Sequence, residues 1–590
     1  MTINLEADSL LSEQGYKLVT DYYLQGDEKS PQEAFRRASN FFASDAAHAQ
    51  RLYSAVSKQH FMFSSPILSN AGEGNKGMPI SCFLTYVPDT IDGLTEHNKE
   101  FSYLSVYGGG VGGHWDDVRN VSSKSPGPIP FMGVVDKAVL AFKQGETRKG
   151  AYAAYLDVIH PAIQEFIQMR VPTGGDINRK NFNIHNAVNL TDDFMDAVKH
   201  DGMWDLTDPK DFKITDTVRA RTIWESILET RHRTGEPFLN FIDTVNDALH
   251  WSQKRLGLKV RGSNLCNEIH LPTNEERTAV CCLASLNLEK YHEWKPTLVA
   301  DLIEMLDNVI EYFINNAPDT IQKAKYAAMR SRDLGLGAMG WHGLLMQKGI
   351  PFVSEEATAL THEIFGYVKD EADKASLHLA KTKGPCPDSI ETGGNERNLH
   401  KLAIAPNANS SAICNATASI EPISSNAYPH RTRAGTHLIV NKYLKPMLAK
   451  YAPTGLLTML DMCPDKWLDA QVNSVVANDG SVQHLPYLSE LDKEVFKTFK
   501  EIDMVGLVEQ AGERQKYLCQ GQSLNITVDA KADRGYLNKI HLTAYEVGCK
   551  GMYYLRTGSV QKIDKVSTEI KRAVLEPQDV QNDECTSCHA

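Results

Sequence analysis

Residues 264 to 268 place an amide, a thiol and a carboxylate at alternate positions of the chain. These are Asn264, Cys266 and Glu268, in the stretch Asn-Leu-Cys-Asn-Glu. If the segment is extended, alternate side chains point to one side, so the three groups would face one space. They would offer a hydrogen-bonding group, a sulfur centre and a base to one small substrate. Taken alone, the stretch favours a simpler interpretation, a surface strand with an incidental buried cysteine, because free cysteine is often simply buried.

Two further motifs match known signatures that their surroundings do not support. Glycines 108 to 113 formally match G-x-G-x-x-G, but the sequence that follows does not favour a helix, so we reject a dinucleotide-binding turn. Cys585-Thr-Ser-Cys588-His589 matches the attachment signature of c-type haem. It lies at the end of a sequence without an export signal, and one cysteine pair falls short of a four-ligand zinc site. A dithiol on a mobile tail, able to exchange with a disulfide, is the better interpretation.

Composition limits the class of protein. The 590 residues carry a formal net charge of −12, which argues against a general nucleic-acid binder. The N-terminus has neither the basic nor the apolar region of a signal peptide, and no apolar run is long enough to span a membrane. The 11 cysteines are too dilute for a disulfide scaffold, so we expect a cytoplasmic protein with mostly reduced thiols.

The elements that must position these groups follow from hydrophobic spacing. Apolar residues recur at helical intervals in residues 32 to 59 and 300 to 314, which predicts helices there. Such helices alternate with short apolar runs, for example residues 279 to 283, and this alternation indicates an α/β architecture. From about residue 563 the chain becomes polar, which is typical of a mobile tail.

Five separate elements occur in one order along the chain. They are Ser81-Cys82, residues 264 to 268, residues 279 to 288, residues 406 to 410 and Tyr553-Tyr554. Together they resemble the large, catalytic subunit of class I ribonucleotide reductases, from about residue 10 to the C-terminus. The resemblance implies an α/β fold, a ten-stranded barrel with a central finger loop that carries Cys266. It implies a helical N-terminal region at residues 1–60, the barrel with effector loops at 61–562, and a redox-active tail at 563–590.

The resemblance also implies a role for each residue of the reacting centre. Cys266 matches the cysteine that becomes a transient thiyl radical and takes hydrogen from the ribose 3′-carbon. Glu268 matches the carboxylate that accepts the 3′-hydroxyl proton, and Asn264 the amide that hydrogen-bonds the ribose. Cys82 and Cys281 match the thiol pair that supplies two electrons and ends as a disulfide. The product would be a 2′-deoxyribonucleotide for DNA synthesis.

Two adjacent cysteines, Cys281 and Cys282, stand where the family pattern needs one. Aligning Val-Cys-Cys-Leu with that pattern favours Cys281 as the redox partner. If the segment is a strand, Cys282 points to the opposite face.

The dipeptide Tyr553-Tyr554 matches the pair that carries an electron and a proton to the active-site cysteine from a radical in a separate small subunit. No metal or radical cofactor is then expected in this chain, because the dimetal cofactor belongs to that subunit. The pair favours class I over an adenosylcobalamin-dependent class II-type reductase. That class, and a non-catalytic nucleotide-binding paralogue, remain the alternatives.

The resemblance implies partners as well. Cys585 and Cys588 match tail cysteines that re-reduce the active-site disulfide and are themselves reduced by thioredoxin or glutaredoxin. Ribonucleoside diphosphates are the expected substrates, and the chain is expected to form a homodimer. Ser65, Ser81 and Gly110 match substrate-contacting positions. The loop expected to hold the substrate diphosphate at a helix start comprises Pro406, Asn407, Ala408, Asn409 and Ser410.

Allosteric control is the last implication. Asp89 and Arg119 match contacts to an effector nucleotide, a dNTP or ATP, at a specificity site. Residues 170 to 180 resemble loop 2, which relays the identity of the effector to the substrate base. Many relatives begin with an ATP-cone domain. Core-like sequence starts within the first dozen residues here, so we expect no switch of that kind.

Overall fold

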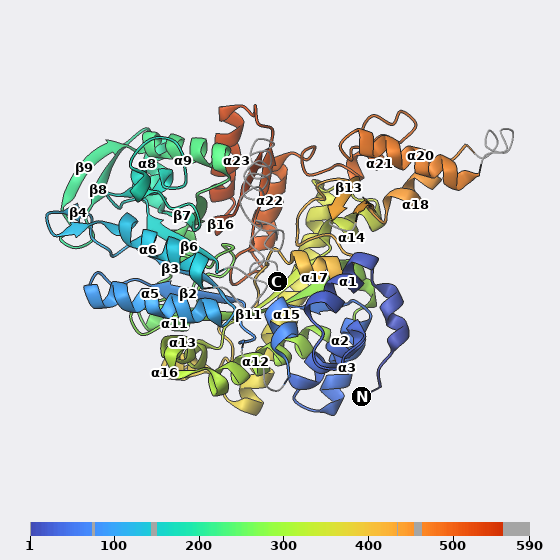
Figure 1. Cartoon of the computed structure of the whole chain (residues 1–590), viewed down its shortest axis with the longest axis horizontal. Coiled ribbons are helices and arrows are strands. Elements are labelled where there is room, and N and C mark those ends of the chain that lie inside the picture. Colours follow the sequence, from blue (N-terminus) through green and yellow to red (C-terminus); the bar gives the residue numbers. More distant parts are fainter. Residues whose placement is uncertain (1, 73–76, 143–149, 433–434, 454–462, 558–590) are drawn as a thin grey trace.

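The computed structural model describes residues 2–72, 77–142, 150–432, 435–453 and 463–557 (Figure 1). Helices α1 (Glu13–Tyr22), α2 (Pro31–Phe41) and α3 (Ala46–Ser57) form the N-terminal region. The helix expected at residues 32 to 59 is therefore two helices. Asp45 causes the break, because its side chain accepts a hydrogen bond from the backbone N–H of His48 and starts a new helix.

One sheet of nine strands forms the centre of the molecule. Its order is β1-β11-β2-β3-β6-β7-β10-β16, with β12 on the other side of β11. Strands β2, β3, β6, β7 and β10 run parallel to one another, as expected for an α/β protein. The bounds are β1 (Phe61–Phe63), β2 (Cys82–Tyr86), β3 (Gly110–His114), β6 (Tyr152–Asp157), β7 (His185–Leu190), β10 (Phe238–Phe241), β11 (Ala279–Asn287), β12 (Leu334–Met339) and β16 (Gly551–Met552).

Strand β11 joins the two parts of this sheet. Its first residues pair antiparallel with β2 and its later residues pair antiparallel with β1, while β12 runs parallel along its other edge. All of β11 is buried, which explains its nearly continuous apolar sequence. Isolated parallel bridges from Leu336 to Leu402 and from Ile404 to Gln522 continue the sheet beyond β12. The α/β barrel class is as expected; the described sheet has nine named strands and these bridges rather than ten strands.

Helices cover the outside of the sheet (Figure 1). The helix expected at residues 300 to 314 is confirmed as α12 (Leu298–Asn316), whose apolar stripe is buried. Among the described residues, no helix is both long and apolar enough to cross a membrane. Other covering helices are α5 (Ile91–Val106), α6 (Pro128–Ala141), α7 (Ile163–Gln168), α8 (Asp192–Lys199), α9 (Ala220–Thr234), α13 (Gln322–Ser331), α15 (Glu355–Lys383), α22 (Met504–Gln515) and α23 (Arg534–Glu546).

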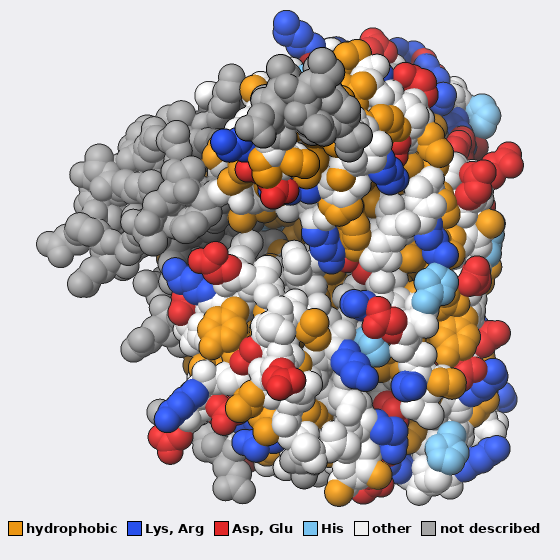
Figure 2. Space-filling view, turned by 90° about the vertical axis from the view of Figure 1, so that its right-hand side faces the viewer, with side chains coloured by type: hydrophobic (Ala, Val, Ile, Leu, Met, Phe, Trp, Pro, Cys, Tyr) orange, Lys and Arg blue, Asp and Glu red, His pale blue; other side chains and the backbone are white. Residues whose placement is uncertain are grey.

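A small lobe, which the sequence analysis did not predict, has a separate hydrophobic core. It comprises β13 (Ala427–Thr432), β14 (Gly435–Val440), α18 (Leu444–Ala449), α20 (Pro464–Ala477) and α21 (Glu490–Val495). Figure 1 shows it at the upper right, and Figure 2 shows acidic and basic side chains interspersed on that side of the molecule. Shorter elements are α4 (Ser65–Asn70), β4 (Val121–Ser122), β5 (Ser125–Pro126), β8 (Met203–Thr207), β9 (Ile214–Arg219), α10 (Ile242–Asp247), α11 (Trp251–Arg255), α14 (Trp341–Lys348), α16 (Pro387–Glu391), α17 (Ala408–Ile413), β15 (Ile526–Val528) and β17 (Leu555–Thr557).

A buried ion cluster fixes α12 against the segments around β12. The Asp307 carboxylate on α12 accepts hydrogen bonds from Arg332 Nε at 2.9 Å and from Arg397 Nε at 2.8 Å. Burial alone would raise the pKa of Asp307, but the two guanidinium groups beside it lower this pKa overall. The carboxylate is thus charged, paired and out of contact with water.

We predict that Asp307→Ala lowers the free energy of unfolding by about 3–5 kcal/mol, because it leaves two buried guanidinium groups without their carboxylate. Asp307 has a folded-state pKa below its unfolded value. Its contribution is therefore present at neutral pH and is lost as the pH falls through the folded-state pKa. Urea unfolding at several pH values measures this loss. Asp469→Ala, which breaks an exposed pair with Lys445, is the control and should cost about 0.5 kcal/mol or less. Equal costs for the two variants would contradict the prediction.

Candidate active site

The stretch from Asn264 to Glu268 forms a turn rather than the extended segment that the sequence analysis assumed. Asn267 has a φ of 60°, a left-handed conformation that asparagine tolerates. The Asn264 Oδ1 atom accepts hydrogen bonds from the backbone N–H groups of Glu268 and Ile269, both at 3.1 Å. This side chain replaces the strand partners that an extended segment would need. Asn264, Cys266 and Glu268 are nevertheless all buried in one turn.

Several strands of the barrel hold this turn from outside. Tyr155 on β6 donates its hydroxyl hydrogen to the Asn264 carbonyl at 2.7 Å, and Asn267 Nδ2 donates to the Leu239 carbonyl at 2.7 Å. Strand β3 passes so close that a Cβ atom on Gly112 would lie 2.0 Å from the Ser263 carbonyl oxygen. The glycine-rich stretch is thus a strand that makes room for the turn, in agreement with the rejection of a dinucleotide-binding motif.

Cys82 and Cys281 lie directly opposite each other where β2 pairs antiparallel with β11. The Asn264 Nδ2 atom donates to Cys82 Sγ at 3.0 Å, so the turn touches this pair. Burial raises the pKa of both thiols, and the neighbouring Glu268 charge raises the pKa of Cys82 further. Both groups are therefore protonated thiols at neutral pH.

Cys282 faces the opposite side of β11, as expected for adjacent residues of a strand. Its Sγ atom donates to the Leu306 carbonyl on α12 at 3.5 Å, within the main hydrophobic core. The geometry therefore separates two neighbouring thiols, with Cys281 beside Cys82 and Cys282 behind the strand.

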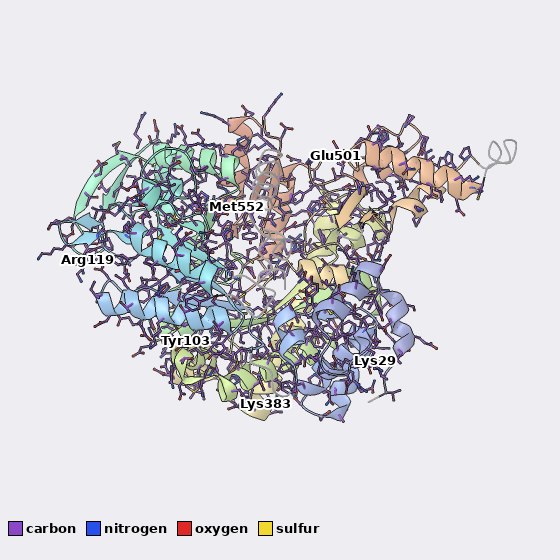
Figure 3. All side chains as sticks on the ribbon, in the orientation of Figure 1. Lys29, Tyr103, Arg119, Lys383, Glu501 and Met552 are labelled. Carbon is purple, nitrogen blue, oxygen red and sulfur yellow. The ribbon has the colours of Figure 1, made fainter. Side chains whose placement is uncertain are left out.

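Tyr553 and Tyr554 follow β16, and their ring centroids are 4.3 Å apart. Tyr553 belongs to the same buried cluster as Cys266, together with Phe238 on β10. Arg231 Nη2 donates to the Tyr553 carbonyl at 3.1 Å and fixes the backbone of the pair. Figure 3 shows Met552, the residue before the pair, close to the centre of the molecule. Tyr553 thus packs in the same cluster as Cys266, and the partly buried Tyr554 packs against that cluster.

Two family models match nearly the whole chain. The model for the ribonucleotide reductase barrel domain matches residues 80–393 and 387–555, and the model for the all-alpha domain matches residues 9–76. The chain belongs to the ribonucleotide reductase family. This reductase is 38% identical to the ribonucleoside-diphosphate reductase large subunit of Invertebrate iridescent virus 3, over 100% of both chains. It is 50% identical, over 92% of each chain, to a protein named as such a large subunit in Frog virus 3 (isolate Goorha).

The fold agrees with a solved structure. The class Id ribonucleotide reductase alpha subunit of Actinobacillus ureae superposes with a TM-score of 0.81 at 30% identity, covering 95% of this reductase and 99% of that chain. The chain is thus similar to large subunits of a two-subunit enzyme along nearly its whole length.

Two of the expected substrate residues of the reductase, Ser65 and Asn409, contact Tyr23, which the sequence analysis missed. The Tyr23 hydroxyl lies 2.7 Å from Ser65 Oγ and accepts from Asn409 Nδ2 at 3.2 Å. Asn407 precedes the first residue of α17 without a capping hydrogen bond from its side chain, so residues 406 to 410 do lie at a helix start. The hydroxyl of Ser410 donates to the Phe63 carbonyl at 3.2 Å. Ser81 donates to Ser64 at 3.4 Å, and Gly110 pairs with Cys82 across β2 and β3.

The expected effector residues lie apart from this centre, and Arg119 is at the left edge of Figure 3. Asp89 and Arg119 pair with each other, with Arg119 Nε 2.6 Å from Asp89 Oδ2. The loop at residues 170 to 180 lines a cavity of about 380 Å³, where Arg179 pairs with Glu165. Cys585 and Cys588 lie outside the described residues.

Three residues of the site besides Tyr23 carried no signal in the sequence. Tyr155 and Ser523 hold the turn, and the Ser523 hydroxyl donates to the Cys266 carbonyl at 2.8 Å and to Glu268 Oε2 at 3.3 Å. His185 contacts the Tyr554 hydroxyl. These residues lie far in sequence from the motifs and do not share a spacing with them, so only the fold brings them into contact.

We predict opposite outcomes for two neighbouring substitutions. Cys281→Ser should abolish steady-state deoxynucleotide formation, because the thiol beside Cys82 is lost. Cys282→Ser should retain at least about half of the parent rate, because a serine hydroxyl can still donate to the Leu306 carbonyl. The steady-state rate of deoxynucleotide formation, relative to that of the parent enzyme, measures the effect of each substitution. An active Cys281→Ser enzyme together with an inactive Cys282→Ser enzyme would reverse the assignment.

Proposed function

We propose that the chain reduces ribonucleoside diphosphates by a thiyl-radical mechanism centred on Cys266. The observation that carries this proposal is the Asn264 side chain, which closes the turn bearing Cys266 and also contacts Cys82. One small substrate can therefore meet the radical cysteine, the Glu268 carboxylate and the thiol pair at once. In this proposal Asn264, Cys266, Glu268, Cys82 and Cys281 keep the roles that the family resemblance gave them.

The chemistry balances with these groups. The Cys266 thiyl radical takes the hydrogen atom of the ribose 3′-carbon, and Glu268 accepts the 3′-hydroxyl proton. The 2′-hydroxyl leaves as water after it receives a proton from one thiol of the pair. The pair then supplies two electrons, gives its second hydrogen to the 2′-carbon and becomes a disulfide, while Glu268 returns its proton to the 3′-oxygen. Cys266 then returns the hydrogen atom to the 3′-carbon. The raised pKa values of Cys82 and Cys281 support this role, because both thiols keep the protons that the reaction consumes.

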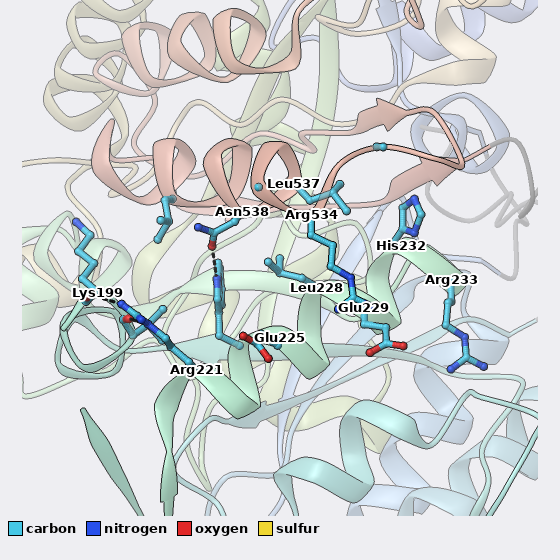
Figure 4. Close-up of a pocket in the computed structure, with 15 residues that line it drawn as sticks. Lys199, Arg221, Glu225, Leu228, Glu229, His232, Arg233, Arg534, Leu537 and Asn538 are labelled. Carbon is cyan, nitrogen blue, oxygen red and sulfur yellow. Dashed lines mark hydrogen bonds between the residues drawn. The ribbon is translucent and has the colours of Figure 1, made fainter. Parts of the chain in front are cut away.

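The radical would come from a small subunit through Tyr554 and Tyr553, whose rings contact each other at an angle of 54° in the cluster that contains Cys266. A groove of about 730 Å³ lies beside this exit, between α9 and α23 (Figure 4). Its apolar lining includes Trp224, Leu228 and Leu537. Helix α9 ends at Gly235, whose carbonyl accepts a hydrogen bond from the Leu555 backbone N–H just after the tyrosines, at 3.1 Å. We therefore place the docking site of the small subunit in this groove.

The charges of the groove indicate the chemistry of the docking segment. Basic side chains at its lining, Lys199, Arg221, Arg233 and Arg534, outnumber the acidic ones, Glu225 and Glu229. A segment with apolar residues that fill the groove and acidic residues at its rim would complement this lining.

The remaining partners are proposed on the resemblance alone. Thioredoxin or glutaredoxin would reduce the tail thiols Cys585 and Cys588, which in turn reduce the active-site disulfide. Effector nucleotides would bind near Asp89 and Arg119, and two copies of the chain would form a dimer.

The first test addresses Cys266. Cys266→Ser should lower turnover below detection with a matching small subunit, because the O–H bond of serine is too strong to exchange hydrogen with ribose. Substrate and effector should still bind with parent affinity, as equilibrium binding would show. Turnover by the parent chain with adenosylcobalamin and no small subunit would instead support the class II alternative. Turnover by the serine variant would exclude Cys266 as the radical site.

The second test addresses the groove. Arg534→Glu should weaken binding of the small subunit about tenfold or more, because it reverses an exposed charge at the groove. Lys445→Glu, on the small lobe, is the charge-matched control and should leave this affinity unchanged. Surface-immobilised small subunit measures both affinities. Equal affinities for the two variants would place the docking site elsewhere.

A further inference from the structure

The Tyr554 hydroxyl has a neighbour that the family motifs do not include. His185, the first residue of β7, places its Nδ1 atom 3.3 Å from the Tyr554 oxygen. The two rings meet edge to face with centroids 5.9 Å apart. His185 also stacks on Phe238 at 5.8 Å, and Phe238 contacts both tyrosines. The imidazole is therefore packed into the aromatic cluster that carries the tyrosine pair.

A buried carboxylate fixes this imidazole. Glu236 Oε1 lies 2.8 Å from His185 Nδ1, and Glu236 is only 2% exposed. Glu236 Oε2 accepts the backbone N–H of Asn186 at 3.2 Å and lies 3.2 Å from Arg170 Nε. Burial alone would raise the pKa of Glu236, but Arg170, His185 and this N–H lower it overall. Glu236 is thus an ionised carboxylate at neutral pH.

The charge of Glu236 decides which atom carries the hydrogen. An ionised carboxylate only accepts hydrogen bonds, so the hydrogen between the two groups must reside on His185 Nδ1. The same nitrogen faces the Tyr554 oxygen at 3.3 Å, so its one hydrogen is shared between Glu236 Oε1, the nearer acceptor, and the Tyr554 oxygen. The Tyr554 oxygen therefore accepts the weaker branch of this shared hydrogen bond, and the phenolic hydrogen of Tyr554 must point away from Nδ1.

We propose that His185, oriented by Glu236 and Arg170, is a positioning residue for hydrogen transfer between Tyr554 and Tyr553. The proposal rests on the radical pathway proposed above. In that transfer a hydrogen atom leaves Tyr553, whose O–H bond breaks, and joins oxidised Tyr554, whose O–H bond forms. The His185 N–H stabilises the Tyr554 oxygen as it gains electron density. Because His185 Nδ1, the atom that faces Tyr554, already holds a hydrogen, this atom cannot take the proton, which stays within the tyrosine pair.

The isolated large subunit suffices for the test. With 3-nitrotyrosine incorporated in place of Tyr554, the absorbance of the nitrophenolate reports the pKa of this hydroxyl directly. A donated hydrogen bond stabilises the phenolate, so His185→Phe should raise this pKa by about one unit, a tenfold change in its ionisation constant. His185→Gln can still donate an N–H, and should restore at least half of the shift. The charged groups around the probe, Glu236, Arg170 and Arg231, are the same in every variant.

The control is 3-nitrotyrosine in place of Tyr22, a half-exposed residue of the N-terminal helices, whose pKa should not respond to His185→Phe. An unchanged pKa at position 554 in His185→Phe would overturn the proposal, as would a lowered one. If His185→Phe fails to fold, His185→Leu, which also lacks the N–H, takes its place: a raised pKa that the Gln variant restores would support the proposal, and an unshifted or lowered one would overturn it. Retained turnover by Tyr554→Phe would instead refute the radical pathway, whatever the probe shows.

Discussion

The reacting centre depends on one side chain amide. Asn264 closes its own turn with Oδ1 and reaches Cys82 on β2 with Nδ2. The first contact sets where Cys266 and Glu268 lie, and the second sets their distance from Cys82. Both the oxygen and the nitrogen of this amide are buried and hydrogen-bonded, so rotation of the side chain would break at least one of the two contacts. The position of the turn in the barrel is thereby tied to β2, the strand that carries Cys82.

The barrel can accept this turn only because its walls allow a close approach. Gly112 lets the backbone of β3 lie against Ser263 where any larger residue would collide. On the opposite side, the long strand β11 pairs with both β1 and β2 and so joins the sheet around the turn. The pairing of β11 with β2 also sets Cys281 opposite Cys82. The same hydrogen-bond register therefore joins these two strands of the barrel and aligns the two thiols.

Sequence patterns located what depends on local periodicity or on a compact motif. The helix at α12, the buried strand β11 and the opposite faces of Cys281 and Cys282 follow from spacing alone. Spacing did not predict the turn at Asn264. An asparagine whose side chain accepts hydrogen bonds from nearby backbone N–H groups cannot be distinguished by sequence from an asparagine in a strand. Tyr155 and Tyr23 could not be found, since each acts through a contact distant in the chain. The sequence pattern did not predict the small lobe, because residues from short, separate elements form its hydrophobic core.

The opposition of Cys82 and Cys281 has a consequence for folding stability. The two residues are far apart in sequence, so a disulfide between them would close a loop of well over a hundred residues in the unfolded chain. The entropy of closing such a loop is worth about 5 kcal/mol to the folded state. If the pair alternates between thiols and a disulfide as proposed, each turnover would add a covalent cross-link between β2 and β11. Each re-reduction would remove that cross-link. By linkage, the fold would make the disulfide harder to reduce by roughly 100 mV. The barrel keeps the two thiols at a high effective concentration, which favours the disulfide. The external reductant must therefore be strong enough to reduce a disulfide that the fold itself stabilises.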